Sequence, residues 1–133
     1  MWKILSLVQD DIQENEVKIK QEEQIPETIP EEDGVKEVKR RILIGPEDGS
    51  ANIIMRYFRV LPGGNTPYHE HDFEHVVRIE KGKGVVVNAD QEEIQVTAGQ
   101  SIFIPGGEKH QFKNPNDEPF EFICTILNPE KIR

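Results

Sequence analysis

Short runs of alternating apolar and polar residues fill the chain from residue 38 onward. Because successive side chains of a strand point to opposite faces, this alternation is typical of half-buried β-strands. The pattern predicts strands at 38–44, 52–61, 68–71, 75–80, 85–88, 93–97, 101–104, 110–113 and 120–127. Turn-forming residues separate these runs at intervals that indicate a β-sandwich or barrel. No segment shows a long helical period, so we expect an all-β fold.

The first 34 residues depart from this pattern and form a predicted N-terminal arm, which leaves residues 35–133 for the β-barrel domain. Pro26 and Pro30 rule out a continuous helix in the arm, although residues 17–20 could form a short strand. The arm could extend into solvent, or it could lie along a sheet edge of its own chain or of a partner. In the second case Ile25 and Ile29 would supply apolar contacts.

Composition and charge restrict the classes of function. The chain has 133 residues, enough for one domain, and a net charge of −9 that is concentrated in the arm. This acidity argues against a nucleic-acid or anionic-membrane partner. No apolar run approaches the roughly 20 residues that span a bilayer, and the apolar start at residues 1–8 lacks a small-residue cleavage site, so we expect a cytoplasmic protein. Cys124 is the single cysteine, which leaves no intrachain disulfide.

Four histidines are the candidate chemistry of this chain. His69 and His71 lie two residues apart, so on an extended strand both would leave by the same face. His75 opens the next predicted strand and His110 opens a distant one, which lets four imidazoles converge on one point. Imidazole suits Zn, Cu, Fe, Ni and, less strongly, Mn. The spacing alone leaves a second interpretation, in which these are ordinary surface or core histidines.

The histidines fall within two longer motifs. The pattern G-x5-H-x-H-x3-4-E-x6-G is matched by Gly63, His69, His71 and Gly82, with His75 in place of the glutamate. The pattern G-x5-P-x-G-x2-H-x3-N is matched at every position by Gly99, Pro105, Gly107, His110 and Asn114. Through both motifs the chain resembles the cupin superfamily. The resemblance implies a double-stranded β-helix, also called a jelly-roll barrel, with the extended arm before it.

The histidine at the glutamate position is the one departure from the family pattern. Glu74 lies beside His75, but strand alternation points its side chain to the opposite face. We therefore expect His69, His71, His75 and His110 as the ligands, as in a subgroup of small four-histidine cupins that this chain resembles. That resemblance implies one divalent transition metal per chain, with manganese expected first and iron, nickel, zinc or copper as alternatives. Four neutral ligands would leave the full +2 charge on the ion and favour anionic ligands.

Strand parity predicts the lining of a substrate pocket. If His110 points inward, then so does Phe112, and an outward Glu121 turns Phe122 and Cys124 inward. We expect Tyr68 at the pocket rim. The alternative for both phenylalanines is ordinary core, and for Cys124 a small buried hydrophobe rather than a thiol beside the metal. Arg56 and Arg59 have opposite parity, so at most one of them faces inward.

Three functions fit these residues. The first is an oxidoreductase resembling cupin dioxygenases, which acts on a small organic substrate at an open four-histidine metal site. The second is a small-molecule binding or sensing protein without turnover, and the third is a non-oxidative metal enzyme such as an isomerase or decarboxylase. The resemblance also implies a homodimer whose chains exchange N-terminal strands, and residues 38–44 read as an edge strand that invites pairing.

Overall fold

Eight strands form one curled antiparallel sheet in the computed structural model, which describes residues 16–131. The strands are β1 (Lys36–Ile44), β2 (Ile53–Asn65), β3 (His75–Lys81), β4 (Lys83–Val87), β5 (Glu93–Thr97), β6 (Ser101–Ile104), β7 (Gln111–Lys113) and β8 (Phe120–Leu127). Three short 3-10 turns, η2 (Glu22–Gln24), η3 (Pro46–Asp48) and η4 (Pro129–Lys131), complete the described elements. The predicted all-β jelly-roll class is confirmed.

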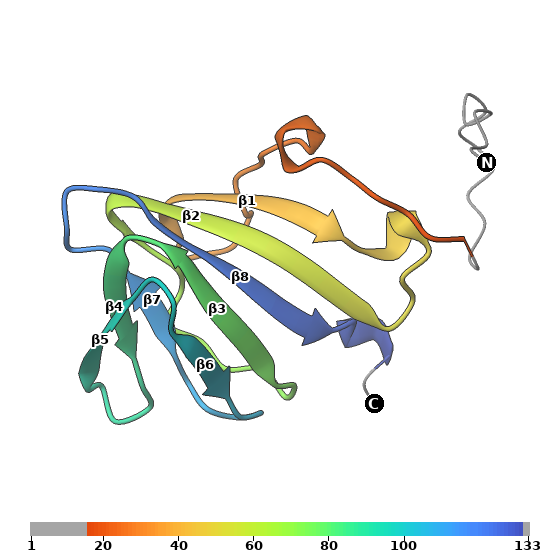
Figure 1. Ribbon diagram of the computed structural model, residues 1–133. Helices are drawn as coiled ribbons and strands as arrows, with labels where there is room; N and C mark the ends of the chain where they lie inside the picture. The colour runs from red at the N-terminus through yellow and green to blue at the C-terminus, as the bar shows by residue number, and fades with distance from the viewer. Residues whose placement is uncertain (1–15, 132–133) are drawn as a thin grey trace.

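The sheet is ordered β5-β4-β7-β2-β8-β3-β6, and β1 pairs with β2 beside this path. Figure 1 shows β1, β2, β8 and β3 side by side as a broad curved surface, with β4, β5 and β7 gathered at one end. Strand β2 joins the two parts, because it pairs with β8 over most of its length and with β7 at Asn65. The curled sheet therefore encloses an interior that faces both parts.

The longest strand extends further than its sequence suggests. The pattern predicts that this strand ends at residue 61, but β2 runs on to Asn65 through Pro62, Gly63 and Gly64. A shift in the pairing with β1 accommodates these residues, and Gly63 adopts a φ of +82° that favours glycine. Gly64 packs against backbone oxygens of β1, where a side chain would collide. A bulge thus replaces the predicted turn.

The predicted strand at 68–71 is wrong, because residues 66–74 are almost entirely irregular. Their backbone hydrogen bonds go to Phe112 of β7, to His110 and to the turn before it, and form no continuous ladder. His69 and His110 form an isolated antiparallel bridge with N–H···O distances of 3.0 and 2.9 Å, and Gly107 donates to the carbonyl of His71 at 2.7 Å. No strand forms at the predicted 17–20 segment either, where Val17 and Ile19 are exposed.

Alternating side chains of the strands fill the interior. On β8 the residues Phe120, Phe122, Cys124 and Ile126 are buried, which confirms the predicted parity with Glu121 facing outward. Aromatic rings form the centre of this core, with Phe122 stacked on Phe112 at 4.4 Å and on Phe58 at 5.2 Å between centroids. These rings bury a large apolar surface, and their packing stabilises the contact between the two parts of the sheet.

The described part of the arm lies along β1 of its own chain. Thr28 forms an antiparallel bridge with Arg40, and the Arg41 Nε donates to the carbonyl of Ile25 at 3.0 Å. The Arg59 guanidinium binds both carboxylate oxygens of Glu27 at 2.9 Å, a bidentate geometry that is stronger than a single contact. Of the two alternatives for the arm, the structure supports the one in which it lies on a sheet edge. Residues 1–15 of the predicted arm are outside the described residues.

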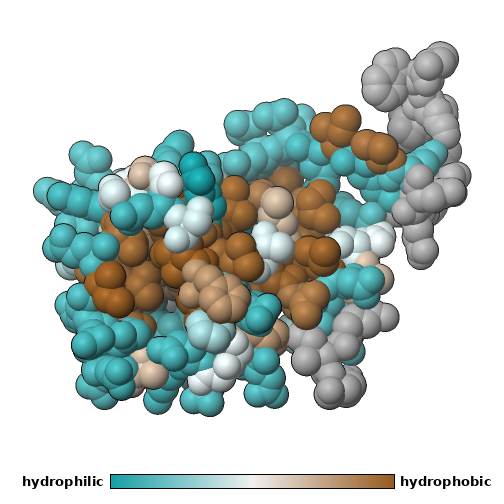
Figure 2. Space-filling model, turned by 60° about the horizontal axis from the view of Figure 1, so that its bottom comes forward, coloured by the Kyte–Doolittle hydropathy of each residue, from teal (hydrophilic) through white to brown (hydrophobic). Residues whose placement is uncertain are grey.

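The outer face of the sheet carries exposed apolar residues. Figure 2 shows hydrophobic residues gathered over a broad area of the face it presents, framed by hydrophilic ones. On the outer face, Val76 of β3 and Phe103 of β6 face each other across neighbouring strands, and each is more than half exposed. Ile53, Met55 and Leu127 are exposed on β2 and β8. No helix among the described residues is long and apolar enough to cross a membrane.

Candidate metal centre

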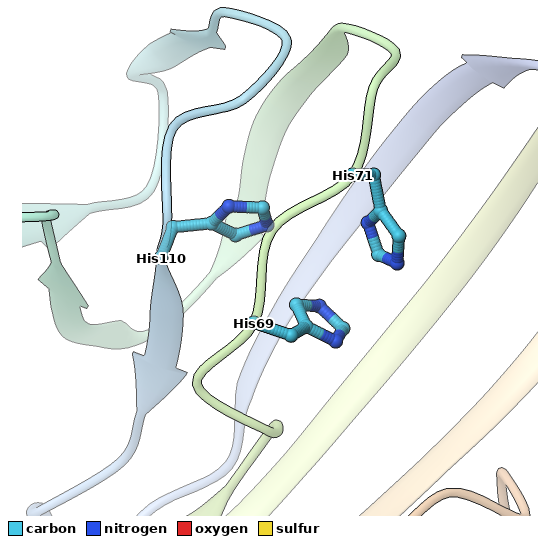
Figure 3. A group of neighbouring side chains, drawn as sticks. All are labelled: His69, His71 and His110. Carbon is cyan, nitrogen blue, oxygen red and sulfur yellow. The ribbon is translucent and has the colours of Figure 1, made fainter.

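Three histidines from two separate segments meet at one side of the interior (Figure 3). Each offers one ring nitrogen, and these nitrogens lie within 4.8 Å of one another. His69 and His71 come from the irregular crossing between β2 and β3, and His110 stands immediately before β7. The backbone bridge between His69 and His110 sets the separation of the two segments. Such a group could hold a metal ion, because imidazole is a common ligand of divalent transition metals.

The fourth histidine lies beside this group. His75 is the first residue of β3 and is 5% exposed, and its ring lies 4.6 Å from that of His110 and 5.3 Å from that of His71 between centroids. Its nitrogen does not belong to the tight group of three. The Nδ1 atoms of His71 and His75 are both buried without a hydrogen-bond partner in the described structure. A buried nitrogen without a partner is costly, so these atoms fit a site in which an ion supplies the missing contact.

Two of the imidazoles are oriented by hydrogen bonds at Nδ1. His69 Nδ1 lies 2.9 Å from a carboxylate oxygen of Glu32, and His110 Nδ1 lies 2.8 Å from the backbone oxygen of Glu108. Both partners accept, so Nδ1 carries the proton in each ring and Nε2 is left with its lone pair. Metal-bound histidines are commonly fixed in this way by a carboxylate or a carbonyl. The donor set therefore fits a divalent transition metal.

Burial keeps the histidines in the form that binds metals. It lowers the pKa of all four imidazoles, and the nearby positive charge of Arg56 lowers each pKa further. The effect is largest at His75, whose pKa falls to about 3 through burial and the neighbouring His110 and Arg56. The negative charge of Glu32 opposes this trend at His69 and His71. Neutral imidazoles at neutral pH are ready to act as ligands without losing a proton.

The histidines line a cavity of about 200 Å³ inside the curled sheet. Phe112, Phe122 and Cys124, which parity predicts to face inward, are part of its wall. Tyr68, expected at the rim, is not among the lining residues. Its hydroxyl donates to the backbone oxygen of Asn88 at 2.7 Å, and the Lys109 ammonium lies 4.8 Å from its ring centroid. The cavity exceeds by more than tenfold the roughly 10–15 Å³ that one water needs, so it can admit a small organic molecule.

The sequence interpretation misses two charged residues of this cavity, Arg40 and Glu32, and leaves open whether Arg56 or Arg59 faces inward. Arg40, Arg56 and Glu32 all contribute to the lining. Parity restricts Arg56 and Arg59 to opposite faces, and the structure turns Arg56 inward while Arg59 pairs with Glu27 outside. One signal could have identified Arg56, because Phe58 and Val60 share its parity and form an apolar series that belongs to the core. Glu32 lies in the arm, and no local pattern indicates that it reaches His69.

Comparisons with known proteins agree with this architecture. The solved structure of the polyketide cyclase RemF from Streptomyces resistomycificus superposes with a TM-score of 0.81 at 32% identity, over 84% of this chain and 80% of that one. Over 72 residues the chain is 36% identical to 1-methylthio-D-xylulose 5-phosphate methylsulfurylase from Rhodospirillum rubrum, and over 76 residues it is 32% identical to auxin-binding protein 1 from Arabidopsis thaliana.

These two matches cover 54% and 51% of the present chain. The chain in turn spans less than half the length of either curated relative, 46% of the first and 38% of the second. A profile of the cupin domain matches residues 56–126, a span that includes all four histidines and both motifs. With the jelly-roll architecture and the histidine cluster inside it, this match places the chain in the cupin family.

Proposed function

We propose that this cupin is a metal-dependent enzyme that acts on a small organic substrate, with His69, His71, His75 and His110 as ligands of one divalent ion. The observation that carries the proposal is the group of three histidine nitrogens within 4.8 Å, at the wall of a cavity large enough for a ligand. A divalent ion bound there would polarise an oxygen atom of the substrate and, if it is manganese or iron, would support oxidative chemistry with dioxygen. Manganese is the ion that we expect first.

The residues around the cavity limit what the protein itself contributes. Phe112 and Phe122 form an apolar wall, which excludes water and strengthens electrostatic interactions inside. Among the described lining residues Glu32 is the one carboxylate, and it is already engaged with His69. The described wall therefore holds no second carboxylate to act as a general acid or base beside it. The small number of carboxylates in the wall supports a reaction in which the ion supplies most of the catalysis. A dioxygenase-like oxidation is the reaction of this kind that we expect first.

A second candidate is non-oxidative metal catalysis. It is favoured by the similarity to a polyketide cyclase and to a methylsulfurylase, whose names describe a ring closure and a transfer at sulfur. The third candidate, a binding protein without turnover, uses the same cavity and differs only in that the ligand leaves unchanged. Dioxygen separates the first candidate from the other two, because only the first consumes it.

The test begins with protein purified without chelator and without a histidine tag. Elemental analysis is expected to give about one divalent transition-metal ion per chain in the wild type and a large loss in His75→Ala. The matched control is Glu74→Ala, because Glu74 is the exposed neighbour of His75. Wild-type protein that retains no transition metal, even after loading with manganese, would overturn the proposal.

The same preparations then distinguish the reactions. Manganese- and iron-loaded protein is incubated with a panel of small enols, diols and thioethers, with an oxygen electrode and mass spectrometry as readouts. Substrate-dependent oxygen uptake that is lost in His75→Ala supports the oxidoreductase. Product formation under nitrogen supports the non-oxidative candidate, and tight binding of an unchanged ligand supports the binding protein.

A further inference from the structure

Two arginines project into the cavity from neighbouring strands. Arg40 is on β1 and Arg56 is on β2, and both line the cavity together with the histidines. Arg40 pairs with Phe58 and Ile42 pairs with Arg56, so the two arginines are diagonal neighbours on the same face of the sheet. Side chains in this relationship are close enough for long residues to reach one another or a shared ligand.

Neither guanidinium has a carboxylate partner among residues 16–131. The other two arginines of β1 and β2 do, since Arg41 pairs with Glu22 and Arg59 pairs with Glu27. In contrast, the Nε atoms of Arg40 and Arg56 are buried without any hydrogen-bond partner in the described structure. A buried N–H donor without an acceptor is costly, because it loses its hydrogen bond to water and receives nothing in return.

The contacts that Arg56 does make orient it without neutralising it. One terminal nitrogen donates to the Cys124 sulfur at 3.1 Å, and the guanidinium carbon lies 5.0 Å above the centre of the Phe58 ring. Burial raises the pKa of the Cys124 thiol, so at neutral pH the thiol offers Arg56 a neutral acceptor rather than a negative charge. Within the described residues, Glu32 is the one carboxylate of this cavity, and its ion pair is with His69 rather than with either arginine.

We propose that Arg40 and Arg56 form an oxyanion subsite, which binds the carboxylate or phosphate of a small anionic substrate whose other end reaches the histidine cluster. A guanidinium presents donors in a planar fork that matches both groups, and an oxyanion between the two arginines would satisfy the free Nε donors. The inference deepens the proposed function, because it names the class of substrate. The part that places the other end of the substrate at the histidine cluster rests on that function. The anion subsite itself requires no metal.

The test therefore uses metal-free protein at pH 8, where the histidines are neutral. Isothermal titration calorimetry with oxalate and with inorganic phosphate measures the affinity of wild type, Arg40→Gln and Arg56→Gln. We expect each substitution to weaken binding about tenfold or more, the usual effect of losing a hydrogen bond to a charged group. The control is Arg78→Gln, an exposed arginine of β3, and it should leave the affinity unchanged.

Three features keep the result interpretable. Thermal denaturation shows whether each variant is folded, and Arg56→Lys retains the charge without the fork, so it should bind with an affinity between those of wild type and Arg56→Gln. Preference for oxalate identifies a carboxylate as the natural group, and preference for phosphate identifies a phosphate. Manganese titration of the same variants is a separate readout, so a failure of the metal site and a failure of the anion subsite are seen independently.

Two results would overturn the inference. One is wild-type protein that binds neither anion, or folded Arg40→Gln and Arg56→Gln that bind both anions with the affinity of wild type. The other is an equal loss in Arg78→Gln, which would mean that the anions are attracted by overall charge rather than by the cavity.

Discussion

The carboxylate of Glu32 lies 2.9 Å from Nδ1 of His69, so a side chain of the N-terminal arm reaches the histidine cluster. The two residues are far apart in the sequence, and the arm brings them together by running along β1. A carboxylate in this position fixes the tautomer and the orientation of the imidazole and makes its other nitrogen a better ligand. The arm thus contributes to the candidate metal site as well as to the sheet.

Replacing Glu32 with alanine should weaken metal binding about 10- to 100-fold, the usual effect of removing the hydrogen-bond partner of a ligand. Competition with a chromophoric chelator measures this affinity. Glu31→Ala serves as the control, because Glu31 is the exposed neighbour and should leave the affinity unchanged. Equal affinities in wild type and Glu32→Ala would show that the contact with His69 has no role in binding the ion.

The stability of the metal-free protein should fall in acid through the buried histidines. The folded state holds the pKa of His75 at about 3, below its ordinary value of 6.5, so the unfolded chain binds a proton first. The contribution of the neutral His75 imidazole to the free energy of unfolding is therefore complete above pH 6.5. It is lost progressively as the pH falls toward 3. His75 alone adds up to about 1.4 kcal/mol per pH unit to the slope over that range.

Urea denaturation in the presence of chelator, repeated between pH 7 and pH 5, measures this slope. His75→Leu removes one titrating group and should give a shallower dependence than wild type. The carboxylates titrate in both proteins, so their contribution to the pH dependence cancels when the two slopes are compared. Identical slopes would contradict the assignment of the effect to His75.

Gly84 of β4 packs directly against the ring of Phe120, and a methyl group at this position would overlap the ring. Gly84→Ala should therefore lower the free energy of unfolding by about 1–3 kcal/mol, as overpacking of a core does. Lys83→Ala, at the exposed neighbouring position, should change it by much less. Chemical denaturation of the three proteins under one buffer provides the measurement, and a neutral Gly84→Ala would show that the ring of Phe120 moves freely aside.

We expect the protein to form a homodimer through the apolar outer face. Val76 and Phe103 face each other there and are 57% and 58% exposed, and large exposed apolar areas are typical of interaction sites. The edge of β1 is partly covered by the arm of the same chain, which makes it a less available surface than its sequence suggests. Light scattering at micromolar concentration should give a dimer for wild type and a monomer for Phe103→Asp.

The control for this substitution is Ile94→Asp on β5, an exposed apolar position on a different strand pair, which should remain dimeric. A monomeric wild type would contradict the expectation directly.

Sequence reasoning predicts the fold class because the relevant signals are local. Strand alternation and turn residues repeat along the body, and the parity of β8 follows from a single outward residue, Glu121. The histidines could also be singled out, since their spacing is contained in two short motifs. Burial and the ring contacts agree with a common location for all four, although three of them form the tight group.

The remaining features depend on long-range contacts that no short window contains. Residues 68–71 have an extended pattern, yet their backbone hydrogen bonds go only to His110 and to Gly107 in the turn before it, so they form an isolated bridge and no strand. Arg40 faces inward because of the register in which β1 pairs with β2. Strand parity alone does not determine that register. The contact between Glu32 and His69 depends on the path of the arm, and its acidic composition is equally typical of a solvated tail.

The pairing of β8 between β2 and β3 bears on when the proposed ion could bind. Strand β8 is synthesised after both of its neighbours, and His110 precedes it only shortly. A nascent chain can expose His69, His71 and His75 long before the frame that positions them exists. An ion could therefore enter the finished geometry only after β8 has been made and has paired with both neighbours.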